Sequence, residues 1–147
     1  MTYEKWILRG GQLIVEQYTG YCTFEDVMTN EEHLFAQFDP FSGPPLLLSD
    51  ISRAHFPEIK SEQLSELFQP LDDHLLKAKG MKEAIYTGAN QYEDFKKVME
   101  YSDLSVNRPV SIIPFNSLDR ALRWLGTTKE EQAMIKEQLS AAFLKKE

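Results

Sequence analysis

The sequence has one cysteine, Cys22, and its three histidines stand at no spacing that zinc sites use. A single cysteine cannot form an intramolecular disulfide, which is typical of proteins from a reducing compartment. We therefore expect no metal and no cofactor, and we interpret Cys22 as a small buried thiol beside the end of a strand.

Positive charge is also scarce. The chain has 16 Lys and Arg residues against 23 Asp and Glu residues, which gives a net charge of −7. The phosphate backbone of DNA or RNA would meet a mostly repulsive surface, and no basic stripe interleaved with aromatic residues is present. The composition therefore excludes nucleic acid as an expected partner.

Long apolar runs are absent as well. The longest are a few residues, such as residues 46–48, whereas a helix needs about 20 to cross a bilayer. The N-terminal residues lack the layout of a signal peptide. We expect no transmembrane segment and a cytoplasmic location.

The residues that are present are those of a folded protein. The chain is 42% hydrophobic, 27% charged and 12% aromatic, and its 147 residues are enough for one continuous core. The whole of residues 1–147 is therefore expected to form a single α/β domain.

Strand and helix periods alternate along the chain. Residues 6–9 and 13–18 predict a hairpin that turns at Gly10 and Gly11. The periods that follow predict, in order, helix 24–38, strand 45–51, helix 64–75, strand 82–88, helix 90–99, strand 109–115, helix 118–125 and helix 128–143. This order predicts a mixed sheet of about five strands whose later members are parallel, with helices packed on it and strand 45–51 in its middle.

Four single residues carry local predictions about the helices. Glu31 interrupts the apolar face of helix 24–38, and Pro70 is expected to kink or divide helix 64–75. Ser61 and Asn90 are expected to cap the helices that follow them.

Three segments carry a resemblance to a known family. Residues 20–26 (Gly-Tyr-Cys-Thr-Phe-Glu-Asp) begin a helix, residues 47–52 end a strand in Asp-Ile-Ser, and residues 112–125 read Ile-Ile-Pro-Phe-Asn-Ser-Leu-Asp-Arg-Ala-Leu-Arg-Trp-Leu. Together they resemble the SpoIIAA-like family within the STAS group, the fold of bacterial anti-sigma-factor antagonists. The resemblance implies a SpoIIAA-like (STAS-like) α/β fold, which Sec14-type lipid carriers share.

One loop departs from the phosphorylatable members of that family. They carry Asp-Ser-Ser-Gly after the Asp-Leu-Ser strand, whereas residues 56–62 here read Phe-Pro-Glu-Ile-Lys-Ser-Glu. The resemblance therefore points to the non-phosphorylatable branch.

Three functions are open at this stage. The resemblance implies a non-catalytic regulatory module that binds a protein, with a homodimer as one form of that binding. The alternative is a carrier or sensor of a small apolar ligand or lipid, indicated by the many Phe, Leu and Met residues of the helices. A weaker alternative is a hydrolase that uses Ser52 and His55 with Asp50. No Gly-x-Ser-x-Gly elbow surrounds Ser52, so we expect no enzyme activity.

The expected fold also suggests where a partner binds. In open α/β sheets, ligands lie beyond the carboxyl ends of the strands. The polar and aromatic residues expected at those ends form a candidate binding rim, made of Asp50, Ser52, Arg53, Thr87, Asn90, Phe115 and Asn116.

Overall fold

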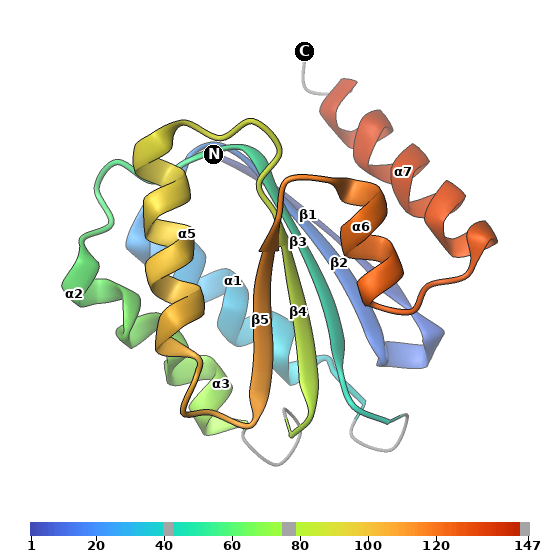
Figure 1. Cartoon of the computed structure of the whole chain (residues 1–147), viewed down its shortest axis with the longest axis horizontal. Helices are drawn as coiled ribbons and strands as arrows, with labels where there is room; N and C mark the ends of the chain where they lie inside the picture. The colour runs from blue at the N-terminus through green and yellow to red at the C-terminus, as the bar shows by residue number, and fades with distance from the viewer. Residues whose placement is uncertain (40–42, 75–78, 145–147) are drawn as a thin grey trace.

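The computed structural model describes residues 1–39, 43–74 and 79–144. The strands of this part are β1 (Thr2–Leu8), β2 (Leu13–Tyr21), β3 (Leu46–His55), β4 (Met81–Tyr86) and β5 (Val110–Phe115). They form one five-stranded sheet in the order β1-β2-β3-β4-β5 (Figure 1). The β1–β2 pair is antiparallel and the other pairs are parallel. The predicted mixed α/β sheet is confirmed, with β3 in its middle.

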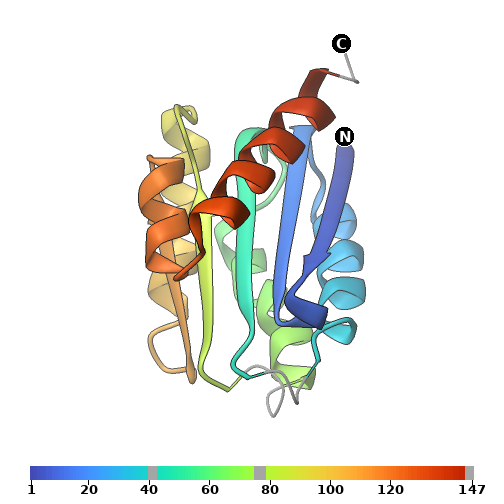
Figure 2. The same cartoon turned by 90° about the vertical axis from the view of Figure 1, so that its right-hand side faces the viewer.

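Helices cover both faces of the sheet. Their bounds are α1 (Phe24–Ala36), α2 (Ser61–Leu64), the 3₁₀ turn η2 (Glu66–Phe68), α3 (Gln69–Asp73), α5 (Tyr92–Leu104), α6 (Leu118–Trp124) and α7 (Lys129–Leu144). Each step from β2 to β5 moves one strand in the same direction, so right-handed crossovers put all the connecting helices on one side. That side, here called the first face, carries α1, α2, α3 and α5, while α6 and α7 lie on the second face (Figures 1 and 2).

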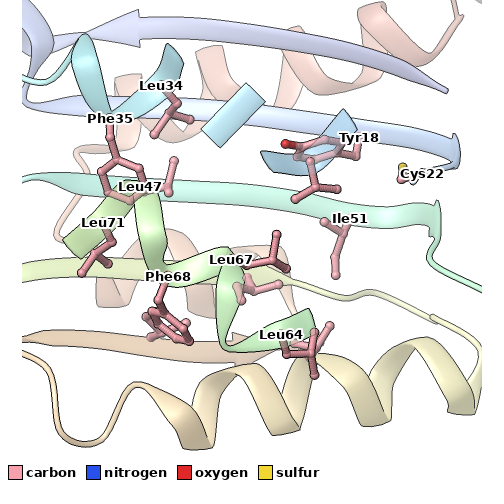
Figure 3. Packing of buried hydrophobic residues seen from close by; sticks show 14 of the residues in the cluster. Tyr18, Cys22, Leu34, Phe35, Leu47, Ile51, Leu64, Leu67, Phe68 and Leu71 are labelled. Carbon is pink, nitrogen blue, oxygen red and sulfur yellow. The ribbon is translucent and has the colours of Figure 1, made fainter. Parts of the chain in front are cut away.

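Alternate side chains of the strands supply two cores. On the first face, Tyr18, Ile51 and Leu47 contact apolar side chains of α1, α2 and η2 (Figure 3). On the second face, Leu48 and Ala84 lie in a separate cluster with residues of α6 and α7. The parallel strands β2 to β4 thus have helices on both sides, and most of their side chains are buried.

Strand β3 is longer than predicted because it contains a bulge. Its register against β2 runs from the Gln17–Asp50 pair to the Thr19–Arg53 pair, so β3 holds one more residue than β2 between them. The strand then continues to His55 instead of ending at residue 51. After a bulge, the side chains point to the opposite face from the one that strict alternation predicts. The alternation by which a strand is recognised in the sequence is therefore interrupted.

The local predictions at the helices had mixed outcomes. Pro70 divides the predicted helix 64–75, because it lies in the first turn of α3, where its missing N–H is tolerated. The two cap predictions are wrong. Ser61 is the first helical residue of α2, after Lys60, and Asn90 precedes the actual cap of α5, Gln91. The Asn90 amide instead donates a hydrogen bond of 2.9 Å to the carbonyl oxygen of Ile51 in β3.

Candidate functional site

The predicted rim residues lie near the carboxyl ends of β3, β4 and β5, and three of them come together at the bulge of β3. Asp50 accepts hydrogen bonds from the Ser52 hydroxyl at 2.6 Å and from the Ser52 amide at 3.0 Å. Its other carboxylate oxygen accepts from the Gln17 amide at 3.0 Å. Asn90 joins this group through the carbonyl of Ile51. These polar groups hold the irregular strand in place.

Two other rim residues pair with each other. The Thr87 amide and hydroxyl both donate to the carbonyl oxygen of Phe115, at 2.8 and 3.1 Å. The Phe115 ring packs on Trp124 with 5.6 Å between ring centroids. Arg53 and Asn116 are exposed. The structure therefore brings Asp50, Ser52 and Asn90 together and pairs Thr87 with Phe115.

His55 has a partner other than the one the hydrolase hypothesis needs. Its Nδ1 lies 3.0 Å from Asp94 Oδ2 on α5, and the other oxygen of Asp94 accepts from the Phe56 amide at 2.9 Å. Ser52 and His55 thus belong to two separate hydrogen-bonded pairs, Ser52–Asp50 and His55–Asp94. The His55 pair borders an open depression of about 340 Å³, whose other walls include the exposed Tyr21.

A smaller cavity with a mostly apolar lining, also partly open to the surface, lies between the sheet and the helices of the first face. Its volume is about 90 Å³, which exceeds the space that one water molecule needs. Residues 56–67 contribute only apolar side chains to its wall, and Tyr18, Ile51, Leu64 and Leu67 of that wall are visible in Figure 3. Three glutamates, Glu16, Glu31 and Glu83, also face it, and we call them the glutamate cluster.

The strand register places two of the glutamates side by side. Glu16 on β2 is the direct neighbour of Ser49 on β3, and Glu83 on β4 is the neighbour of Leu47, one pleat from Ser49. Residues two apart on a strand point to the same face, so Ser49 stands between the two carboxyl groups. Glu16 is 1% exposed and Glu83 is 6% exposed. Helix α1 adds Glu31 from across the cavity wall.

The carboxyl group of Glu16 takes part in several hydrogen bonds. Tyr3 donates to one of its oxygens at 2.9 Å and Ser49 donates to the other at 2.5 Å. The carboxyl group of Glu31 shares a hydrogen bond with Glu16, and Tyr18 donates to Glu31 at 3.1 Å. A hydrogen bond between two carboxyl groups needs one proton, so this pair holds a proton between its two members.

Burial raises the pKa of all three glutamates. For Glu16 the loss of hydration is opposed by the bonds from Ser49, Glu31 and Tyr3. For Glu31 burial and the charge of Glu16 act together and hold the pKa well above the ordinary value. Burial, followed by the charge of Glu16, raises the pKa of Glu83 to about 8. Carboxyl groups perturbed in this way are typical of functional sites.

Glu83 is the least satisfied member of the cluster. Within the part of the chain that the structure describes, the polar group in hydrogen-bond range of its carboxyl is the Ser49 hydroxyl, at 3.4 Å. That hydroxyl has one proton, and its shorter bond to Glu16 uses it. Glu83 is therefore a buried carboxyl group that faces the cavity and that, when ionised, has only this long contact with Ser49 as a donor among the described residues.

Two other kinds of site have less support. Among the described residues, no group of three or more His, Cys, Asp or Glu side chains is arranged to hold a metal ion, so the glutamates do not converge as ligands. Burial raises the pKa of the Cys22 thiol to about 11, which makes this residue a poor nucleophile.

No sequence motif marks the glutamate cluster, although each member stands at a position where a charged residue is unusual. In the sequence, Glu31 interrupts the apolar face of a predicted helix. Glu16 and Glu83 lie inside the strands β2 and β4, at positions that the structure buries. A charged residue at a position that the fold must bury is a candidate site residue, because burial of a charge is costly.

Comparisons with family models, curated proteins and solved structures gave no match to this chain. The resemblance to the SpoIIAA-like family stays a prediction, and the function is argued from the site. Within the described ranges, no helix combines the length and the apolar character that crossing a membrane requires.

Proposed function

We propose that this protein binds a small amphipathic molecule in the cavity beneath α1, α2 and α5, as a carrier or sensor that leaves the molecule unchanged. The observation that carries the proposal is a cavity of about 90 Å³ that combines an apolar wall with the carboxyl group of Glu83. Ligand sites are commonly apolar pockets with a few polar groups that orient the ligand.

The volume limits the size of the ligand. An apolar cavity of roughly 150 Å³ accommodates benzene. A cavity of about 90 Å³ is therefore suited to a molecule of about four heavy atoms, or to one end of a longer molecule. A carrier of this kind agrees with the predicted likeness to Sec14-type folds.

Binding without chemical conversion is supported by the partners of the reactive groups. Ser52 donates to Asp50, and His55 pairs with Asp94 on another element. Nucleophilic catalysis by serine needs the hydroxyl and its base in one hydrogen-bonded arrangement. The two separate pairs favour a structural role for each.

The experiment is a two-dimensional ¹H–¹⁵N NMR titration with n-butanol, n-butylamine and butyrate. These probes share one carbon chain and differ in the head group. We expect saturable shifts at cavity residues with at least one probe. Val98→Phe places a ring in the cavity and should abolish these shifts. Val106→Phe makes the same change at a valine that is 78% exposed and should preserve them.

Two results would contradict the proposal. One is the absence of saturable shifts at cavity residues with all three probes. The other is a titration that Val98→Phe leaves unchanged while the variant keeps a folded spectrum, because the probes would then bind elsewhere.

A second candidate function, self-association of the chain, is favoured by an apolar strip on α5. Tyr92, Phe95 and Met99 follow one another at helical spacing and are 73%, 38% and 39% exposed. Sedimentation at increasing concentration should reveal a dimer that Phe95→Glu dissociates and that the exposed-site change Ser111→Glu retains. A wild-type chain that stays monomeric at about 100 µM, well above the micromolar range of weak specific association, would contradict this candidate.

A further inference from the structure

We propose that the molecule bound in the cavity is a small organic cation, an alkylamine whose ammonium group lies against Glu83 and whose carbon chain lies against the apolar wall. This inference rests on the proposed function, since it specifies the ligand of the same cavity.

When it is ionised, Glu83 lacks a close hydrogen-bond donor among the described residues. Its side chain is 6% exposed and faces the cavity, and the Ser49 proton that lies nearest is bonded to Glu16. A carboxylate accepts several hydrogen bonds, and an ammonium group donates three. An ammonium group in the cavity would therefore supply the donor that Glu83 lacks in the described part of the chain.

The second argument is the charge around the cavity. Its wall holds three carboxyl groups and one amine, that of Lys97, which donates a hydrogen bond to the Phe56 carbonyl oxygen. A bound anion would be repelled by an ionised glutamate of the cluster, and a neutral molecule would offer that glutamate no opposite charge. The groups that face the cluster from the surrounding elements are Tyr3 and Lys5 of β1, Tyr18 of β2, and Lys97 and Tyr101 of α5, while Arg108 interacts with Tyr101.

The third argument is the aromatic part of the wall. Tyr18 and Tyr101 line the cavity together with Phe56. Aromatic faces attract organic cations, and this attraction is largest when the site excludes water. The apolar side chains of residues 56–67 would contact the carbon chain of the same molecule. Carboxylates, aromatic rings and an apolar wall together fit an alkylammonium ion.

Binding of the cation is an exchange for a proton. Burial raises the pKa of Glu83 to about 8, so the carboxyl group carries a proton at neutral pH. The ammonium ion enters with its charge, Glu83 loses its proton to solvent, and the ion pair RNH₃⁺···⁻OOC forms with no other bond changed. Because one proton leaves, the amine affinity should rise with pH by up to about tenfold per unit below pH 8.

The test is isothermal titration calorimetry with n-butylamine, n-butanol and butyrate at pH 6.5 and pH 8.5. We expect n-butylamine to bind at least about tenfold more tightly than n-butanol at pH 8.5, with a smaller advantage at pH 6.5. Glu83→Gln should remove the amine advantage and keep n-butanol binding. Glu25→Gln makes the same charge change at an exposed position of α1 and should behave as the wild type.

The outcomes separate this inference from the proposed function. If n-butanol or butyrate binds in the cavity as tightly as n-butylamine, the cation assignment is overturned and the binding function stands. If no probe binds, the binding function is overturned. An amine preference that Glu83→Gln leaves intact also overturns the assignment. Should that variant fail to fold, wild-type titrations at pH 6.5 in two buffers of different ionisation enthalpy decide, because the assignment requires release of about one proton per amine bound at that pH.

Discussion

The hydroxyl of Ser49 lies 2.5 Å from a carboxylate oxygen of Glu16, on the neighbouring strand. Since a serine hydroxyl has a single proton, this bond decides how the two strand glutamates differ. Among the described residues, Glu16 accepts from Ser49 and Tyr3 and shares a hydrogen bond with Glu31, whereas the Ser49 hydroxyl lies 3.4 Å from Glu83. One serine thus stabilises the ionised form of Glu16 more than that of Glu83.

The first prediction is that stability falls as pH rises from 5 to 8. The pKa of Glu83 is about 8 in the folded protein against 4.5 as its ordinary value, so the folded state binds a proton that the unfolded state has lost in this window. The contribution of this carboxyl group is fully present below pH 4.5 and is lost as pH rises through 8. The slope is up to about 1.4 kcal/mol per pH unit for each such proton. Urea unfolding at each pH measures it.

A matched pair of variants assigns that slope. Glu83→Gln removes the titrating group and should reduce the slope by about one proton, while Glu25→Gln, at an exposed position, should keep the wild-type slope. The raised pKa of Glu31 acts in the same direction, so some slope should remain in Glu83→Gln. Wild-type stability that is flat or rising between pH 5 and 8 would refute the assignment of raised pKa values to the cluster.

The second prediction concerns the Ser49 hydroxyl. Ser49→Ala removes a donor from a carboxylate that is 1% exposed, and loss of a hydrogen bond to a buried charged group costs about 1–3 kcal/mol. Because burial raises the pKa of Glu16, the cost should fall as the pH is lowered and the carboxylate gains a proton. Ser111→Ala on β5, an exposed position, should change the free energy of unfolding by less than about 0.5 kcal/mol. Equal effects of the two variants would contradict the role assigned to Ser49.

The fold could be predicted from the sequence because burial imposes a period on apolar residues. The run at residues 46–48 indicated a strand covered on both faces, and β3 does lie in the middle of the sheet. The bulge in β3 could not be predicted in the same way. It adds one residue to a strand without changing which residue types are present, so the strand end was placed at residue 51.

The candidate site was harder to predict because its contacts join distant residues. His55 pairs with Asp94, 39 residues away, and not with Asp50, which is nearer to it in the sequence. Glu16, Glu31 and Glu83 meet only because the register of β2, β3 and β4 and the crossover of α1 put them on one face. In the sequence, Glu31 interrupts an apolar stripe. In the structure, it is a hydrogen-bond partner of Glu16.

The third prediction compares two glycines with positive φ. Gly88 has φ +54°, and a Cβ there would lie 2.8 Å from the Ser52 Cβ, while Gly126 has φ +74° and an open position for a Cβ. Gly126→Ala should cost about 1–2 kcal/mol from backbone conformation alone. Gly88→Ala should cost more, because Ser52 must also shift from its bonds to Asp50. Thermal unfolding of both variants measures the difference, and an equal loss would show that the contact with Ser52 is unimportant.

The fourth prediction concerns the ion pair that ties the end of the hairpin to α7. Arg9 donates to both carboxylate oxygens of Glu131, at 2.8 and 2.6 Å, and this bond lowers the pKa of Glu131 to about 2. A lowered pKa gives stability that is present above the ordinary value of 4.5 and is lost as pH falls through 2. The pair is partly exposed, so Glu131→Gln should cost only about 0.5–1 kcal/mol at neutral pH.

Salt distinguishes this ion pair from the helix cap that the same residue makes. Glu131 also accepts a hydrogen bond of 2.9 Å from the Thr128 amide. A glutamine at this position can accept the same hydrogen bond, so Glu131→Gln removes mainly the charge. The cost of Glu131→Gln should therefore shrink in about 1 M salt, where the screening length is roughly 3 Å. Glu130→Gln alters the exposed neighbour and should have little effect at either salt concentration. If the cost of Glu131→Gln were independent of salt, the link between the hairpin and α7 would depend on shape and capping instead of on charge.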